Sequence, residues 1–340
     1  MSSLPPEYWA LPITNDSLTV DERVTTIVET TQFVLFCCTI TLYFIIVWAL
    51  IEAHKKRVEE LSSPFFKLCL STAGVDIWTL LTNYFGSVFA KWGWFVRVYI
   101  AMGKPYERIY LYFAWSTGIC QAMSVSVLAS NRLSVMLFPT KFHRFWQGYR
   151  LWLAIGIQYS TGLLIGLSTF ANPTQLFRNG RDGLLPKFLN RSLSNTFFAI
   201  GGVFLFTNCL YLVLTYCYLF WVLHKRHKKM TLHRSNTQLP NVTSKLKERA
   251  KTREARLFTM STTIVCVQLV VLCFFVLRAA DIVVLTSDEF YLYYNAMSDL
   301  YASSNAYLLV IFSDALRSYI LQRFGIKKNA SRITSVNPTV

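Results

Sequence analysis

The sequence predicts an all-α integral membrane protein, a bundle of seven transmembrane helices with its N-terminus outside the cell and its C-terminus in the cytoplasm. Three observations support this fold class. Hydrophobic residues make up 53% of the 340 residues. Charged residues make up only 15%, well below the ~25% of soluble domains. The apolar residues also gather in seven blocks, each near the ~20 residues that a helix needs to cross a bilayer.

The seven predicted spans follow one another along most of the chain. They cover residues 30–51, 68–90, 109–131, 151–171, 196–223, 257–285 and 290–312. Residues 93–103 are also apolar, but they include Arg97 and are too few to span a bilayer. We interpret this stretch as an interfacial segment or an extension of a neighbouring helix, and eight spans remain the main alternative to seven.

The bundle covers residues 28–316, between an outer tail, residues 1–27, and a cytoplasmic tail, residues 317–340. The outer tail lacks the basic start and apolar run of a cleaved signal peptide, so we expect the first span to direct insertion. All eight cysteines fall inside predicted spans. We therefore expect no disulfides in the loops and interpret the cysteines as small apolar packing residues.

The distribution of lysine and arginine predicts the orientation. With the N-terminus outside, the cytoplasmic segments carry 24 of these residues and the outer segments carry nine. The loop of residues 224–256 alone holds eleven. Such a loop would suggest nucleic-acid binding in a soluble protein, but here it fits the cytoplasmic face and anionic lipid. We predict no nucleic-acid partner, and we interpret His224, His227 and His233 in this loop as solvated rather than metal-bound.

Two glycosylation sequons agree with this orientation. Asn15 and Asn190 begin Asn-x-Ser motifs that the topology places outside the cell, and we predict that both carry glycans. Asn241 and Asn329 also begin such motifs, but they fall on the cytoplasmic side and should remain unmodified.

Two carboxylates are expected deep inside predicted spans, where charged groups are expensive. Asp76 is about 16 Å along its helix from Phe65, and Asp299 is about 14 Å from Phe290, so both are expected near the membrane midplane. They are compatible with an ion site, a proton relay or a ligand counter-charge, and equally with hydrogen-bonded packing acids. Their flanking residues do not match the motifs of intramembrane aspartyl proteases.

Other polar residues in the spans are candidates for ligand contact or for helix packing. Arg278, with Asp281 three residues later, is expected to snorkel to the outer interface or to stand at a pocket mouth. Asn305 is a further intramembrane polar residue. The third span carries a polar stripe at helical spacing, which could contact a ligand or bind neighbouring helices, formed by Tyr110, Thr117, Gln121 and Ser124.

Three short motifs add a resemblance to a known family. They are "NRLSVMLFP" at 131–139, "TREARLFTMSTTIVCVQLVV" with Gln268, and "SDLYASSNAYLLVIFSDALRSYI" with Asp299 and Arg317. In this order, and with this span layout, the chain resembles the nematode serpentine chemoreceptors of the gamma class (Srg), which are similar to G protein-coupled receptors.

The resemblance implies a receptor in the plasma membrane and sensory cilia. Such a receptor binds a small environmental chemical, signals through a heterotrimeric G protein, and has neither enzymatic activity nor a cofactor. Asn131 and Arg132, at the cytoplasmic end of the third span, would then serve G protein coupling, although Arg132 could also be a snorkelling residue that only anchors the helix. The ligand-pocket candidates are Tyr110, Thr117, Gln121, Arg278 and Asp299.

The sequence also departs from the pattern of rhodopsin-like receptors. Asn131 replaces the acid that precedes the arginine, and the last span reads Asn-Ala-Tyr-Leu-Leu from Asn305 in place of Asn-Pro-x-x-Tyr. A small-solute or proton-coupled transporter using Asp76 and Asp299 is the alternative function, although no inverted repeat is evident. An intramembrane enzyme is a weaker alternative, because no histidine lies in any predicted span.

The basic loop provides a direct test of the topology. An epitope inserted in residues 224–256 should be stained by antibody only after the cells are permeabilised, because its eleven basic residues hold it in the cytoplasm. An epitope near Asn15 should be stained on intact cells. Staining of the loop on intact cells would show that the predicted orientation is wrong.

Overall fold

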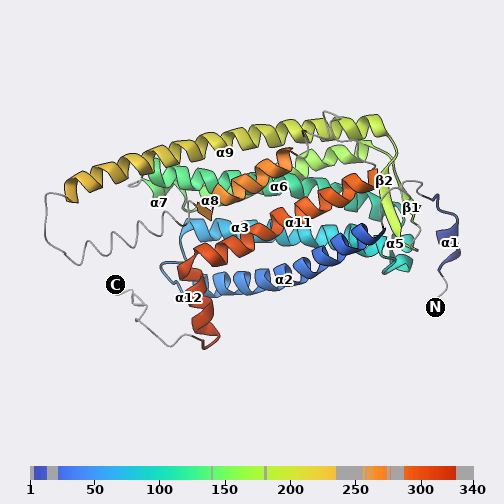
Figure 1. Ribbon diagram of the computed structural model, residues 1–340, viewed down its shortest axis with the longest axis horizontal. Coiled ribbons are helices and arrows are strands. Elements are labelled where there is room, and N and C mark those ends of the chain that lie inside the picture. The colour runs from blue at the N-terminus through green and yellow to red at the C-terminus, as the bar shows by residue number, and fades with distance from the viewer. Residues whose placement is uncertain are drawn as a thin grey trace.

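The computed structural model shows a bundle of long helices that lie side by side (Figure 1). It describes residues 4–13, 22–138, 141–179, 182–234, 256, 259–260, 262–273, 276 and 287–326. Most of the predicted cytoplasmic loop, residues 235–255, and the end of the tail, residues 327–340, lie outside the described residues. The same holds for Asn15, Arg278 and Asp281, so the predictions for these residues stay predictions.

Seven helical segments form the bundle in the described residues. They are α2 (Glu22–Lys55), α3 (Pro64–Asn83), α6 (Lys104–Leu137), α8 (Tyr149–Gly166), α9 (Arg191–Arg234), a helix over Thr262–Cys273 that we name helix six, and α11 (Ser287–Phe312). The α3 helix continues through a π-helical turn, η2 (Tyr84–Val88), into α4 (Phe89–Lys91), and α8 continues into the 3₁₀ turn η3 (Leu167–Ala171). The remaining elements are short: α1 (Pro6–Trp9), α5 (Val96–Met102), α7 (Phe142–Phe145), α12 (Asp314–Arg323), β1 (Thr174–Arg178) and β2 (Leu184–Phe188).

These segments confirm the predicted all-α bundle. Five of them are long and apolar enough to cross a membrane: α2, α3 with its extension, α6, α8 with η3, and α9. Helix six is a shorter apolar helix, and the 26 residues of α11 extend about 39 Å at 1.5 Å per residue. The helices begin before and end after most of the predicted spans, because hydropathy detects only the apolar middle of a helix whose ends reach into water.

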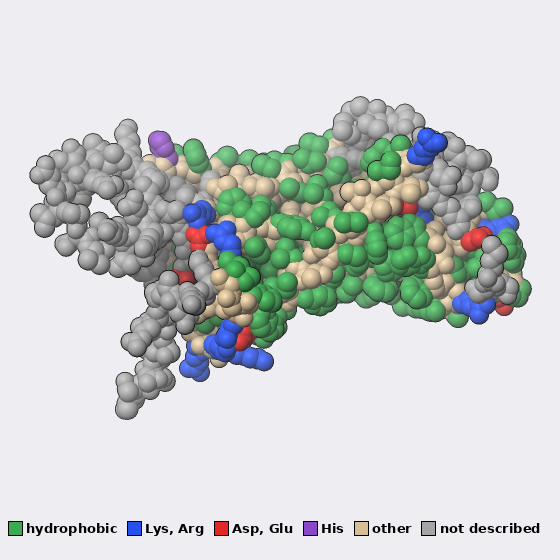
Figure 2. Space-filling model, turned by 60° about the horizontal axis from the view of Figure 1, so that its bottom comes forward, with side chains coloured by type: hydrophobic (Ala, Val, Ile, Leu, Met, Phe, Trp, Pro, Cys, Tyr) green, Lys and Arg blue, Asp and Glu red, His purple; other side chains and the backbone are tan. Residues whose placement is uncertain are grey.

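The α3 and α6 helices form the centre of the bundle. The apolar stretch of α3 is 56% buried and that of α6 is 67% buried, whereas α2, α8 and α9 reach only 22–33%. Large apolar side chains cover the sides of the molecule, and charged side chains gather toward its two ends (Figure 2). This distribution fits a bilayer around the sides, because lipid-facing apolar residues cost nothing in hydrocarbon.

Small residues allow α6 and α8 to approach closely. A Cβ atom at Gly162 would overlap Cys120 Sγ and the carbonyl oxygen of Ser116, and one at Gly166 would overlap Ser116 Oγ. Helices in membranes associate largely through such close packing, since hydrocarbon provides no hydrophobic drive between them. The two glycines of α8 are therefore structural requirements of this helix pair.

A β-hairpin and the N-terminal segment cover one end of the bundle, which we name the hairpin end; the predicted orientation places it outside the cell. Strands β1 and β2 pair antiparallel, and Ile13 forms a parallel bridge with Arg178. Tyr8, 1% exposed, packs with Leu176 and Leu184 of the hairpin. The hairpin is an addition to the predicted helices, although the Asn-Gly and Asp-Gly pairs at 179–180 and 182–183 are its typical sequence signal.

The short apolar stretch at 93–103 contains a separate helix, α5, and not an eighth span. Gly93 and Gly103, which flank it, have positive φ angles of 76° and 54°, so the chain turns sharply on both sides. This agrees with the interpretation of an interfacial segment. At the same end, Asn190 is exposed and its Oδ1 caps α9 by accepting a hydrogen bond from the amide of Leu193 (3.1 Å). A glycan on its Nδ2 would leave this cap intact.

The glycine contacts predict that substitutions at two positions of α8 change the stability of the protein by different amounts. Gly162→Val should destabilise the protein by about 1–3 kcal/mol or more, because its side chain must displace the backbone of α6. Gly156→Val is the matched control, since a Cβ there meets nothing within 4 Å. Melting temperature and folded yield in detergent measure both. Equal behaviour of the two variants would contradict the close α6–α8 contact.

Candidate functional site

A cavity lies in the bundle among α6, α9, helix six and α11. Its volume is about 80 Å³. Its walls are mostly apolar and aromatic, with amide and hydroxyl groups at a few points, and they are formed by Trp115, Gly118, Ile119, Gln121, Ala122, Gly201, Phe204, Leu205, Gln268, Val271, Tyr294, Met297, Ser298 and Tyr301. Among the described residues that form this wall there is no Asp, Glu, Lys or Arg. The cavity therefore suits a small uncharged molecule with a limited number of hydrogen-bonding groups.

Asp76 lies beside this cavity and joins four helices. Its Oδ1 accepts a hydrogen bond from Gln121 Nε2 of α6 (2.9 Å). Its Oδ2 accepts hydrogen bonds from the Tyr43 hydroxyl of α2 (2.8 Å) and from Asn305 Nδ2 of α11 (2.8 Å). Asp76 is 0% exposed. The structure thus brings together three polar residues that the sequence singled out, Asp76, Gln121 and Asn305, and surrounds the carboxylate with donors, as a buried polar group requires.

Asp299 belongs to a different network, closer to the hairpin end. Its carboxylate accepts hydrogen bonds from Asn83 Nδ2 (3.0 Å) and from the Tyr84 hydroxyl (3.1 Å). Asn83 is seven residues beyond Asp76 on α3, which is about 10 Å along the helix. The sequence analysis expected both acids at a similar depth in the membrane. In the structure they lie at different depths along the bundle. The π-helical turn that begins at Tyr84 follows directly on this contact.

Of the predicted ligand-pocket residues, the described cavity wall includes Gln121. Asp299 is 2% exposed and turned toward α3, while the side chain of its neighbour Ser298 reaches the cavity. The reason is helical geometry, since consecutive residues of a helix point about 100° apart. Thr117 of α6 is fully buried, and its Oγ1 has no hydrogen-bond partner among the described residues.

Tyr110 lies in a separate groove. This groove, of about 540 Å³, is bounded by α3, η2, α5 and α6 and is lined almost entirely by apolar and aromatic side chains. The Tyr110 ring packs against Gly86, where any Cβ atom would overlap it. The fourth residue of the polar stripe, Ser124, accepts a hydrogen bond from Gln158 Nε2 of α8 (2.6 Å). The stripe therefore serves several interfaces, and helix packing explains Ser124.

The sequence did not identify most of the cavity wall. Aromatic residues such as Trp115, Tyr294 and Tyr301 occur throughout the spans, so no local signal separates those that face the cavity. Gln268 was visible as an amide in an apolar helix. Its Nε2 donates to Asn208 Oδ1 of α9 (2.7 Å), and its Oε1 accepts from the Tyr301 hydroxyl (3.1 Å). Gln268 thus links three helices around the cavity.

Asn131 and Arg132 lie at the opposite end of α6, away from the hairpin end. Asn131 is 1% exposed, and its Nδ2 has no hydrogen-bond partner in the described part of the chain. Arg132 is half-buried, and its guanidinium carbon lies 4.1 Å from the centre of the Phe65 ring, in the first turn of α3. The two adjacent residues therefore differ: Asn131 faces the helix core and Arg132 faces an aromatic ring.

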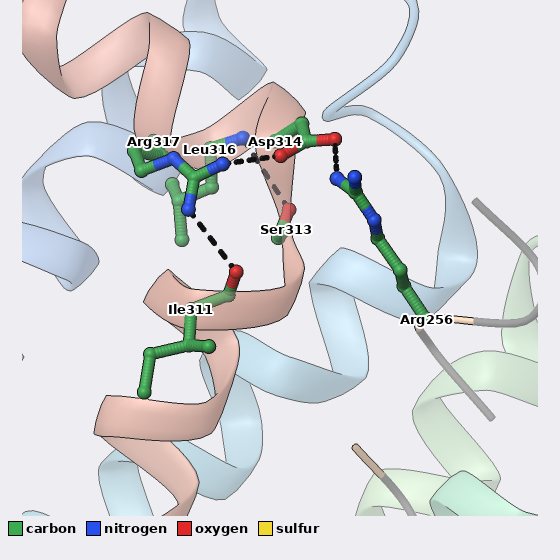
Figure 3. Close-up of polar contacts among 6 residues, drawn as sticks. All are labelled: Arg256, Ile311, Ser313, Asp314, Leu316 and Arg317. Atoms are coloured by element: carbon green, nitrogen blue, oxygen red, sulfur yellow. Dashed lines mark hydrogen bonds and ion pairs between the residues drawn. The ribbon is translucent and has the colours of Figure 1, made fainter. Parts of the chain in front are cut away.

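At this end, α12 turns away from α11 and is held by polar contacts (Figure 3). Ser313 caps it, its Oγ accepting a hydrogen bond from the amide of Leu316 (3.3 Å). Asp314 forms ion pairs with Arg317 of the same helix and with Arg256, which precedes helix six. Burial and the nearby Glu52 carboxylate raise the pKa of Tyr319 to about 12, so this hydroxyl is neutral at physiological pH.

Comparison with known proteins assigns a family to this arrangement. A family model described as "Serpentine type 7TM GPCR chemoreceptor Srv" matches residues 32–326, which is most of the chain. A search of curated proteins found no match. The match agrees with the predicted superfamily of nematode serpentine chemoreceptors, but the predicted gamma class is not confirmed, because Srv is a different class.

The Asp76 network yields a stability prediction. Asp76→Ala leaves the buried amides of Gln121 and Asn305 without this acceptor and should cost about 1–3 kcal/mol for each donor that stays unsatisfied. The Tyr43 hydroxyl keeps the Ala302 carbonyl oxygen (2.6 Å) as an acceptor. Asp76→Asn keeps an acceptor oxygen and should lower the melting temperature less. Thr117→Ala, which removes a buried hydroxyl without a described partner, is the control and should change it little. An unchanged melting temperature for Asp76→Ala would contradict the network.

Proposed function

The chain belongs to the serpentine type seven-transmembrane GPCR chemoreceptors, and we propose that it binds a small environmental chemical in the cavity among α6, α9, helix six and α11 and signals through a heterotrimeric G protein. The family is one of membrane receptors and not of enzymes. The proposed location is the plasma membrane, in a sensory cilium, with Asn15 and Asn190 glycosylated on the outer side.

One observation carries the proposal: the cavity wall includes residues of three buried hydrogen-bond networks, those of Asp76, Gln268 and Asp299. Gln121 reaches the cavity and also binds Asp76, which connects α6 to α2, α3 and α11. Gln268 and Tyr301 reach the cavity and bind each other. Ser298 reaches it and accepts a hydrogen bond from Asn83 (3.2 Å), the partner of Asp299.

Residues that line the cavity and also hold the helices together supply a means of signalling. A ligand that hydrogen-bonds Gln121 or Gln268 competes with the bonds that hold the helices in their present positions. A ligand can shift a conformational equilibrium only through different affinities for the two states, and competition for a shared amide provides such a difference. In hydrocarbon, where water cannot replace a lost partner, the polar groups must find new partners on other helices.

The opposite end of the bundle is the proposed site of G protein contact. Arg132, exposed in part, would make directed hydrogen bonds to the G protein with its guanidinium group. Asn131 is buried, and we assign it the role of holding the end of α6 rather than of touching the partner. At this end, Asp314 of α12 pairs with Arg256, which precedes helix six, and Arg323 of α12 pairs with Glu52 of α2 (2.9 Å).

Agonist-dependent nucleotide exchange on a co-expressed G protein tests the proposal. Cells expressing the receptor are screened with volatile and water-soluble neutral chemicals, and at least one should raise exchange. Uptake of a labelled chemical without any exchange would instead favour the alternative, a transporter that uses Asp76 and Asp299.

Two adjacent glycines of α9 then test the cavity. Gly201 lines it, and a Cβ there would lie 3.2 Å from the Trp115 ring, so Gly201→Leu should fill the cavity and weaken the agonist response about 10-fold or more. Gly202→Leu is the matched control, because a Cβ at Gly202 meets nothing within 4 Å. Both are compared at equal surface density. An unchanged response of Gly201→Leu would place the ligand elsewhere.

A further inference from the structure

The contact between Arg132 and Phe65 joins the end of α6 to the beginning of α3. The guanidinium carbon of Arg132 lies 4.1 Å from the centre of the Phe65 ring, well inside the ~6 Å range of a cation–π interaction. Phe65 is 8% exposed, although it lies in the first turn of its helix. An arginine at the end of a span would otherwise be expected to extend toward water.

The Phe65 ring is itself fixed. Pro64 begins the helix, with its φ already set for the first turn, and the Phe66 ring meets the Phe65 ring edge to face at 5.3 Å. Both rings belong to the main apolar core of the bundle. The ring face that receives Arg132 is therefore presented by a rigid element, and the position of the guanidinium depends on how α6 and α3 pack.

The residue before Arg132 makes this ring important. Asn131 has a neutral amide and is 1% exposed, so it offers no carboxylate to hold the neighbouring guanidinium. A ring face attracts a cation less strongly than a carboxylate does, because it presents a quadrupole and not a full negative charge. Such a contact restrains the arginine and yet releases it when α6 moves away from α3.

We propose that Phe65 is the positioning residue for Arg132, that its ring restrains the guanidinium in the absence of ligand, and that separation of α6 from the first turn of α3 releases it for G protein coupling. This inference rests on the proposed function. If the ring restrains Arg132, weakening the contact must increase ligand-independent signalling. A residue that only fills space would change stability alone.

The experiment weakens the ring's attraction without changing its shape. Phe65 is replaced by 3,4,5-trifluorophenylalanine in the full-length receptor, which withdraws electron density from the ring face and keeps an aromatic, apolar side chain of similar size. The same replacement at Phe66, which is 1% exposed and contacts Phe65 edge to face, is the matched control. Basal nucleotide exchange at equal surface density is one measurement. The other is the melting temperature of the purified receptor, with and without Arg132→Gln.

The proposal expects three results. Fluorination at Phe65 raises basal exchange about 2- to 10-fold, in keeping with the strength of a partly buried cation–π contact. It lowers the melting temperature when Arg132 is present and has little effect in the Arg132→Gln background, because the contact is already absent there. Fluorination at Phe66 leaves basal exchange unchanged, and its effect on the melting temperature is the same with and without Arg132→Gln.

Two results would overturn the proposal. An equal loss of melting temperature in both backgrounds would mean that Phe65 only packs. Non-additive melting temperatures with unchanged basal exchange, in a receptor that responds to agonist, would mean that the contact exists but does not restrain signalling. If no variant and no wild-type receptor drives exchange with any chemical, the proposed function fails and this role fails with it, while the melting measurements still report whether the contact forms.

Discussion

A carboxylate buried in the centre of a bundle, with one hydrogen-bond donor from each of three other helices, is the contact on which the arrangement of this receptor depends. Asp76 of α3 binds Tyr43 of α2, Gln121 of α6 and Asn305 of α11. Hydrocarbon supplies no hydrogen bonds, so each of these polar groups must find its partner inside the protein. The pairing therefore restricts how the four helices can rotate and slide against one another.

Close packing provides the second constraint, and it acts where polar groups are fewer. Gly162 and Gly166 bring α8 onto α6, and Gly86 accommodates the Tyr110 ring between α3 and α6. The two kinds of contact divide the central helix by face. One face of α6 packs backbone to backbone, and another carries the amide of Gln121 between the cavity and Asp76. A ligand in the cavity would thus lie beside the polar contacts and away from Gly162 and Gly166.

The two ends of the bundle differ in how their contacts are made. At the hairpin end, Lys91 pairs with the buried Glu29 (2.5 Å), and its backbone oxygen accepts a hydrogen bond from Asn179 of the hairpin (2.8 Å), so the covering segments are attached firmly. At the other end, the pair of Arg256 with Asp314 is largely exposed, and Arg132 rests on a ring face. Exposed ion pairs contribute little to stability. Movement during signalling is therefore easier at the second end, where the partner is proposed to bind.

Much of this could be read from the amino-acid order alone, because a bilayer imposes a length and a polarity on each segment. The block lengths predicted the helical bundle, and the short length of residues 93–103 with Arg97 argued against an eighth span. The amide of Gln268 and the acid of Asp76 stood out in apolar helices for the same reason. The hairpin was not predicted, although its Asn-Gly and Asp-Gly pairs are present in the sequence. Only the tertiary structure decided which polar residues meet, since Asp76 and Asn305, for example, are 229 residues apart along the chain. Helical periodicity shows which residues share a face, but the rotation of each helix and its neighbours come from packing, and that packing turned Asp299 from the cavity and placed Arg132 on Phe65.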